Sequence, residues 1–205
     1  MQLFGRDQIN LDVIAAEFLP DGKQLFIIAA DGDGTLHVLQ YDPENPKSER
    51  GTKLLHRSTF HSGAFPSTMT LLPRTTVSSE TAISVPAHGA DIAADLATQQ
   101  VLVTTQEGGL ALITPLSEQS YRRLSTLQNI LIANLEHPCG LNPRAYRAVE
   151  IDGIGGRAII DGNVVQKWLD QSSQHKSSTA DKCGGTVWDV RGDLEAIGGG
   201  GLGYL

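Results

Sequence analysis

Cysteine is scarce in this 205-residue chain. Only Cys139 and Cys183 are present, and their positions match neither a disulfide framework nor paired metal-binding motifs. This excludes a small disulfide-stapled scaffold and indicates a reducing compartment. The chain is long enough to bury a hydrophobic core without such cross-links.

Long apolar runs are also lacking. No segment approaches the roughly 20 apolar residues that a membrane-spanning helix needs. The start, from Met1 to Asp7, has no apolar core of the kind found in secretory signal peptides. We therefore expect a soluble, intracellular protein with no membrane partner.

Clustered positive charge is missing as well. The formal net charge is −7, from 16 Lys and Arg against 23 Asp and Glu. Residues 1–116 carry 7 basic and 13 acidic side chains, whereas residues 117–205 carry 9 and 10. Generic electrostatic capture of nucleic acid needs clustered Lys and Arg, so the composition argues against it.

Recognisable catalytic motifs are absent from the sequence. There is no Gly-x-Ser-x-Gly elbow and no Cys and His pair with an orienting group nearby. The residues of a catalytic triad come together in space from distant parts of a chain, so the missing motifs only leave such a site without support from the sequence. His137 and Cys139 have no second pair at zinc spacing, and His56, His61 and His88 are interpreted as surface or core residues. We predict no catalytic or metal site.

Two glycine-containing segments resemble ligand loops only superficially. The glycines at 153–156 follow a predicted strand at 146–151 but lack the helix that a dinucleotide loop needs directly afterwards. Asp31 to Gly34 lacks the glycine and glutamate of a calcium loop and is favoured as a hairpin turn. We therefore predict no cofactor, no small-molecule substrate and no enzymatic activity.

The first half of the chain contains short β-like runs divided by Gly and Asp turns, where glycine accepts positive φ. The predicted strands are 11–19, 24–30, 35–41, 53–60, 67–72, 100–105 and 110–114. Residues 73–96, rich in Thr, Ser, Ala and Pro, are predicted to form a surface loop. The spacing is typical of a sandwich or a propeller, and strand pairs around Asp-Gly turns favour propeller blades.

At Pro115 the pattern becomes helical. Ser117 is a predicted N-cap, and the helix should end before Pro138. Its apolar stripe follows three- and four-residue steps: Tyr121, Leu124, Leu127, Leu131 and Leu135. Shorter helices are predicted at 163–170 and 186–196, before a Gly-rich tail that starts at 198. Trp168 and Trp188 are predicted to anchor the packing of these helices.

The notable basic residues in the second half of the chain, residues 117–205, are arginines. Five of the six arginines in this half lie between residues 122 and 157: Arg122, Arg123, Arg144, Arg147 and Arg157. One interpretation is contact with phosphate or with an acidic protein surface. The interpretation we favour is solvation of the helices together with intramolecular ion pairs.

Several of these segments resemble the C-terminal end of the largest subunit of the cleavage and polyadenylation specificity factor. They are Tyr121-Arg-Arg-Leu124, Leu127-Gln-Asn129 and Gly140-Leu-Asn-Pro-Arg-Ala-Tyr-Arg147. The strands at 11–41 are similar too, and the ending at 188–205 is similar to fungal versions. The Gly140 motif favours this branch over the related damaged-DNA-binding adaptor and the splicing-factor subunit.

The resemblance implies a fold of β followed by α. Residues 1–116 would be the closing blades of an incomplete, partial β-propeller, and residues 117–205 a small C-terminal helical domain with a Gly-rich tail. The implied role is a nuclear, non-enzymatic scaffold for pre-mRNA 3′-end cleavage and polyadenylation, with no cofactor. The implied partners are WD40 and zinc-finger subunits and the endonuclease module.

Two alternatives stay open. The first is direct RNA binding, with contacts from Arg122, Arg123, Arg144 and Arg147. The second is an adaptor of the damaged-DNA-binding or splicing-factor type.

The chain also departs from the family's pattern. Family members are far longer, so the resemblance covers only their last propeller strands and the helical domain. Residues 151–157 and 181–185 are unusually rich in glycine. A β half of this size cannot close a propeller alone and would leave unpaired strand edges.

Overall fold

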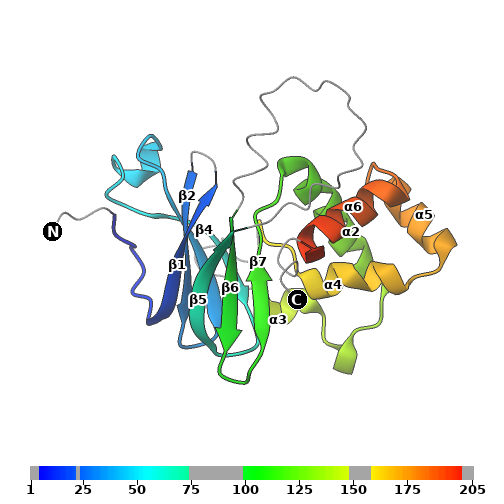
Figure 1. Cartoon of the computed structure of the whole chain (residues 1–205), viewed down its shortest axis with the longest axis horizontal. Helices are drawn as coiled ribbons and strands as arrows, with labels where there is room; N and C mark the ends of the chain where they lie inside the picture. Colours follow the sequence, from blue (N-terminus) through cyan, green and yellow to red (C-terminus); the bar gives the residue numbers. More distant parts are fainter. Residues whose placement is uncertain (1–4, 22–23, 74–98, 148–157, 200–205) are drawn as a thin grey trace.

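A computed structural model describes residues 5–21, 24–73, 99–147 and 158–199 (Figure 1). Strands come first and helices follow. The strands are β1 (Val13–Asp21), β2 (Gln24–Asp31), β3 (Thr35–Tyr41), β4 (Leu55–His61), β5 (Pro66–Pro73), β6 (Gln99–Thr105) and β7 (Leu110–Ile113). The α-helices are α2 (Glu118–Asn134), α3 (Pro143–Arg147), α4 (Gly162–Gln166), α5 (Ser173–Lys182) and α6 (Val187–Gly199). We call β1–β7 the sheet unit and α2–α6 the helical unit.

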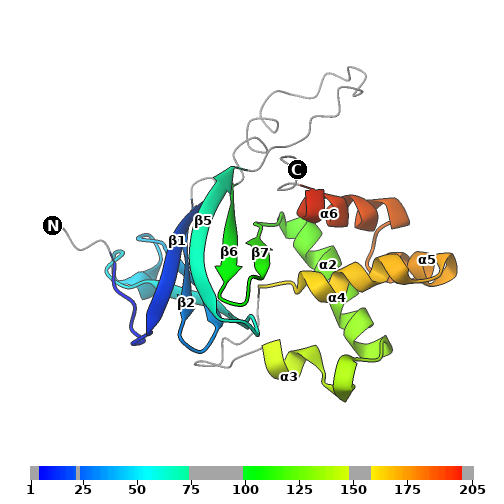
Figure 2. The same cartoon turned by 60° about the horizontal axis from the view of Figure 1, so that its bottom comes forward.

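The sheet unit consists of two antiparallel sheets. Strands β1-β2-β3-β4 pair in chain order, and so do β5-β6-β7. The sheets pack where β1 lies against β5 and β6, as the two views agree (Figures 1 and 2). Leu19, Ile28, Val101 and Val103 fill the core between them. All seven predicted strands are confirmed, each with ends within two residues of those expected.

The predicted hairpin turn at Asp31 to Gly34 is confirmed. Gly34 has φ +76°, a conformation that glycine adopts without steric cost. The Asp31 carboxylate accepts hydrogen bonds from the backbone N–H groups of Asp33 and Thr35 through Oδ1. Its Oδ2 atom lies 2.8 Å from Nε2 of His37, which is fully buried. The other ring nitrogen of His37 lies 3.3 Å from His56 Nε2. Sequence inspection missed His37, whose role here is structural.

The Asp31 carboxylate makes the sheet unit sensitive to acid. Burial alone would raise the pKa of Asp31, but the hydrogen bonds from His37 and Thr35 outweigh burial, and its pKa lies below the ordinary 3.8. A carboxyl group with a lowered folded-state pKa stabilises the fold above its unfolded pKa, and this contribution disappears as the pH falls through the folded pKa. The stabilisation by Asp31 should therefore be lost below about pH 4.

We expect Asp31→Asn to flatten this acid dependence. The variant keeps an oxygen for the turn but has no carboxylate to protonate. The measurement is the urea midpoint of unfolding as a function of pH. Asp33→Asn, in the same turn with an exposed side chain, is the matched control and should follow the wild-type profile. Parallel pH profiles for wild type and Asp31→Asn would contradict the prediction.

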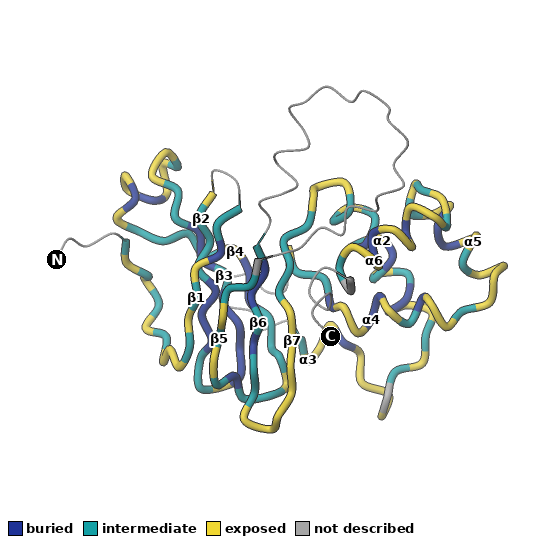
Figure 3. The backbone as a smooth tube through the Cα atoms, in the orientation of Figure 1, coloured by how far each residue is buried: buried dark blue, intermediate teal, exposed yellow. Residues whose placement is uncertain are grey.

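The helical unit is built around the apolar stripe of α2. Ser117 caps the helix, because its side chain accepts a hydrogen bond from the backbone N–H of Ser120, as predicted. The helix ends at Asn134, before Pro138. The fully buried stripe residues are Leu124, Leu127 and Leu131. They pack on Val164, Val165, Trp168, Ala180, Val190 and Leu194 from the later helices. Figure 3 shows buried positions along α2 where it lies beside α4 and α6.

The prediction for the two tryptophans was half right. Trp168 is 1% exposed and anchors the helical core, whereas Trp188 is 74% exposed. The buried apolar residues of α6 are Val190 and Leu194, one helical turn apart. Trp188 lies two positions before Val190, which turns its side chain to the opposite face of the helix. On that exposed face the guanidinium carbon of Arg191 lies 5.8 Å from the centre of the Trp188 ring.

Three other expectations need correction. The predicted strand at 146–151 begins inside α3, because Pro143 at the first helical position starts a helix that lasts to Arg147. The predicted helix at 163–170 is α4 followed by a 3₁₀ turn, Lys167–Asp170. The helix predicted at 186–196 continues through Gly199, two residues into the expected Gly-rich tail.

Helix α5 was not predicted. Its sequence offers no apolar stripe, since Ala180 is its only buried apolar residue. The available signal was Ser172, whose side chain caps the helix by accepting from the backbone N–H of His175.

Some predicted features fall outside the described residues: the loop from residue 74 on, the glycines at 153–156, Arg157 and the tail from residue 200. Within the described ranges, no helix has the length and apolar character to cross a membrane.

Candidate functional site

The two units are joined by the side chain of Arg147, at the end of α3. Its Nη1 donates hydrogen bonds to the backbone carbonyls of His61, at 2.9 Å, and Ser62, at 2.5 Å, which lie at the end of β4. Its Nε donates to Asp161 Oδ2 at 3.1 Å. Its guanidinium carbon is also 5.2 Å from the ring centres of Phe60 and Tyr146. One arginine thus binds the sheet unit and the helical unit at once.

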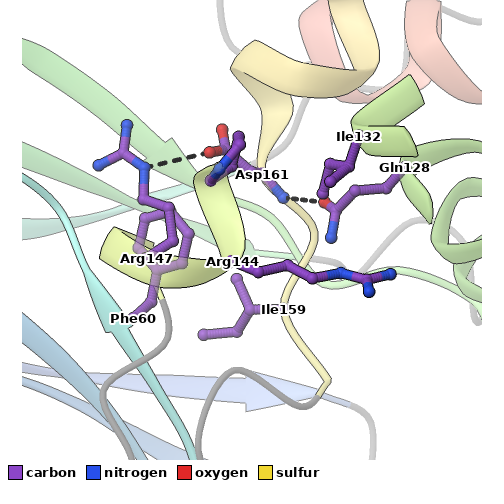
Figure 4. Close-up of a pocket in the computed structure, with 8 residues that line it drawn as sticks. Phe60, Gln128, Ile132, Arg144, Arg147, Ile159 and Asp161 are labelled. Carbon is purple, nitrogen blue, oxygen red and sulfur yellow. Dashed lines mark hydrogen bonds and ion pairs between the residues drawn. The ribbon is translucent and has the colours of Figure 1, made fainter. Parts of the chain in front are cut away.

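Asp161 extends this network into the helical core. Its carboxylate is largely buried, and Oδ1 caps α4 by accepting from the backbone N–H of Asn163 at 3.0 Å. Its own backbone N–H donates to Gln128 Oε1 of α2 at 2.7 Å. Figure 4 shows both interactions of Asp161, with Arg147 and with Gln128. We call Phe60, Gln128, Arg147 and Asp161 the junction.

Of the four candidate contact arginines, three form ion pairs within the helical unit: Arg147 with Asp161, as described above, and the α2 residues Arg122 and Arg123. Arg122 pairs with Glu118 one turn earlier, at 2.5 Å, and both side chains are exposed. Arg123 forms a two-pronged pair with Asp193 of α6, at 2.8 and 2.9 Å, in a largely buried setting. Arg123 thus ties α2 to α6 through two charge-assisted hydrogen bonds, and loss of either partner would leave a largely buried charge without its counter-charge.

Arg144 and Arg147 both lie on α3. Arg144 Nη2 donates to Asn129 Oδ1 at 2.5 Å, a neutral partner. Among the described residues no carboxylate lies within 4 Å of Arg144, whereas Arg122, Arg123 and Arg147 each pair with one. The side chains of Arg144 and Arg147 point away from each other along the edges of one pocket (Figure 4).

That pocket is small. Its volume is about 60 Å³, well below the ~300 Å³ at which sites for drug-sized ligands and cofactors begin. Its lining residues are Phe60, Gln128, Ile132, Pro143, Arg144, Arg147, Ile159 and Asp161. Within the described part of the chain, no group of three or more His, Cys, Asp or Glu side chains is placed to hold a metal ion. The geometry suits contact with a partner's side chain better than binding of a cofactor.

Residues 1–170 match the family model described as the CPSF A subunit region. The chain belongs to the CPSF A subunit family. The resemblance found in the sequence is thereby confirmed at the level of the family. The CPSF A match includes the sheet unit, α2, α3 and every junction residue, and it ends at the 3₁₀ turn that follows α4.

The chain is also similar to curated proteins of fungi. Protein cft1 of Aspergillus niger is 58% identical over 205 residues, covering 100% of this chain and 15% of that protein. Protein cft1 of Aspergillus fumigatus is 57% identical over the same length and the same shares. Protein cft1 of Schizosaccharomyces pombe is 36% identical over 197 residues, 95% of this chain and 13% of that protein. The chain therefore spans only about 15% of the length of these relatives.

Sequence inspection of this CPSF A chain identified Arg147 but missed the other junction residues. Asp161, two positions before the helix predicted at 163–170, could have been assigned as an N-cap. No local pattern could have shown that its second oxygen pairs with Arg147.

Proposed function

We propose that the chain is the C-terminal region of a CPSF A scaffold subunit, with the domain boundary between residues 116 and 117. In this proposal the two sheets are the closing blades of a β-propeller. The outer faces of the two sheets favour it. Phe18 of β1 is 54% exposed on the face away from Leu19, and Leu110 of β7 is 74% exposed on the face away from Ile113. Apolar sheet faces need cover, and further sheets of a longer protein would supply it.

The proposed role is non-enzymatic assembly of the nuclear machinery for pre-mRNA 3′-end cleavage and polyadenylation. The observation that carries it is the family match over residues 1–170, together with 58% identity to a cft1 protein over the full chain. The partners would be the WD40 and zinc-finger subunits and the endonuclease module. The junction supports such a role, because it holds the two units in one orientation, and a preorganised surface loses less entropy on binding.

Recovery of partners from nuclei tests this function. We expect the epitope-tagged chain, expressed in fungal cells, to concentrate in the nucleus and to co-purify with polyadenylation-factor subunits, quantified by mass spectrometry. Trp168→Ala, which removes the anchor of the helical core, should lower their recovery at equal bait, whereas Trp188→Ala should not unfold the bait. Recovery of cullin-ligase or splicing subunits in their place would overturn the assignment.

A further inference from the structure

We propose that the pocket between Arg144 and Arg147 is a docking notch for a short acidic protein segment that inserts one aliphatic side chain. This rests on the proposed scaffold role and adds to it a specific surface and a class of partner. The notch lies at the junction, so an occupant would contact both ends of α3 and the start of α4.

The charge of the notch favours an acidic occupant. Arg147 and Asp161 compensate each other at 3.1 Å. Arg144 donates to the neutral Asn129, and within the described ranges it has no carboxylate partner. Among the described residues, the notch thus holds one positive charge without a carboxylate partner, on the exposed side chain of Arg144. A carboxylate would bind this guanidinium better than an amide does, because charge-assisted hydrogen bonds between two ions are the stronger kind.

The floor of the notch favours an aliphatic side chain. Ile132, Pro143 and Ile159 line it, with the ring of Phe60 at one side. Its volume of about 60 Å³ suits a group of a few methyl and methylene carbons. Leu141, two residues before Pro143 in sequence, is 58% exposed, and Tyr146 of α3 is also exposed. A leucine-like side chain with acidic neighbours combines both properties.

RNA fits this surface less well. Binding of single strands without sequence preference uses several cationic contacts to the backbone and aromatic faces on which bases stack. Here Arg122, Arg123 and Arg147 already have carboxylate partners, and Arg147 lies over the ring of Tyr146.

Fluorescence anisotropy with the full chain tests the notch. The probe is a labelled ten-residue peptide of Asp and Glu with one central leucine. We expect Arg144→Glu to weaken binding by about tenfold or more, because it replaces an attraction between ions by a repulsion. A peptide with serine in place of leucine should bind about tenfold more weakly, because burial of the aliphatic side chain is lost.

Arg122→Glu is the matched control, since it reverses the charge of another exposed arginine of the helical unit. It should change the affinity by less than about threefold. Arg144→Gln is a second variant, which removes the charge without reversing it, in case Arg144→Glu does not fold. The thermal midpoints of unfolding of all variants should match that of wild type. Equal losses for Arg122→Glu and Arg144→Glu, or equal affinity for the leucine and serine peptides, would overturn the notch. So would the absence of peptide binding.

A labelled twelve-residue single-stranded RNA is measured in parallel. RNA binding that is lost in Arg144→Glu, without binding of the peptide, would assign the surface to nucleic acid and overturn the proposal. The scaffold role is judged separately, by recovery of polyadenylation-factor subunits with the wild-type chain. If the notch proposal is wrong, the wild-type chain still recovers these subunits. If the scaffold proposal is wrong, the wild-type chain itself does not recover them.

Discussion

Replacing Trp168 by alanine should lower the free energy of unfolding of the helical unit by about 3–5 kcal/mol. Its side chain is 1% exposed and is the largest in the buried core of that unit, between the α2 stripe and the later helices. Truncation to alanine removes most of that apolar surface and leaves a cavity that the short elements α4 and α5 can fill only in part. Urea unfolding followed by far-UV circular dichroism measures the loss.

Two further variants give this prediction its controls. Trp188→Ala deletes the same side chain from the exposed face of α6 and should cost less than about 1 kcal/mol, including the contact with Arg191. Trp168→Phe should lose less than Trp168→Ala, because the ring still fills much of the space. In addition, the indole N–H of Trp168 has no hydrogen-bond acceptor among the described residues. Similar losses in Trp168→Ala and Trp188→Ala would show that the helical core is organised differently.

The contrast between the two tryptophans shows how far the sequence could predict this fold. Alternating apolar residues and Asp-Gly turns predict the strands, since both signals act between neighbours in the chain. The α2 stripe is equally local, and its caps define both ends. Periodicity within α6 could have placed Trp188 opposite Val190 and Leu194, but composition alone could not. Helix α5 carries almost no apolar signal, and packing against α2 and α6 decides its conformation.

The junction is where prediction from the sequence reached its limit. Arg147 is predicted as a contact residue, but its partners His61 and Ser62 are 86 and 85 positions away. A guanidinium group can be satisfied by any carbonyl or carboxylate, so nothing in the local sequence selects these oxygens. The pairing with Asp161 depends on how α3 and α4 are placed, and residues 148–157, which connect them, lie outside the described part of the chain. The local pattern gave the residue type, and tertiary packing gives the partner.

The Arg147→Ala substitution should lower the free energy of unfolding by about 2–4 kcal/mol and uncouple the unfolding of the sheet unit from that of the helical unit. The substitution leaves the largely buried Asp161 carboxylate without its cation and the carbonyls of His61 and Ser62 without their shared donor. Arg147→Lys keeps the charge but loses the planar fork that reaches both the carboxylate and the carbonyls, so it should recover only part of the loss. Arg122→Ala, at an exposed pair, should cost less than about 0.5 kcal/mol.

The positions of the tryptophans make the uncoupling measurable. Both tryptophans lie in the helical unit, so their fluorescence reports on that unit, while far-UV circular dichroism reports on both units. In the wild type the two urea transitions should coincide, because the junction transmits unfolding from one unit to the other. In Arg147→Ala they should separate.

A double-mutant cycle isolates the pair of Arg147 and Asp161. Asp161→Asn keeps a side chain that can cap α4 but removes the charge, and combined with Arg147→Ala it should give a coupling free energy of about 1–3 kcal/mol. Coincident transitions in Arg147→Ala, or a coupling near zero, would show that contacts other than this arginine hold the sheet unit and the helical unit together.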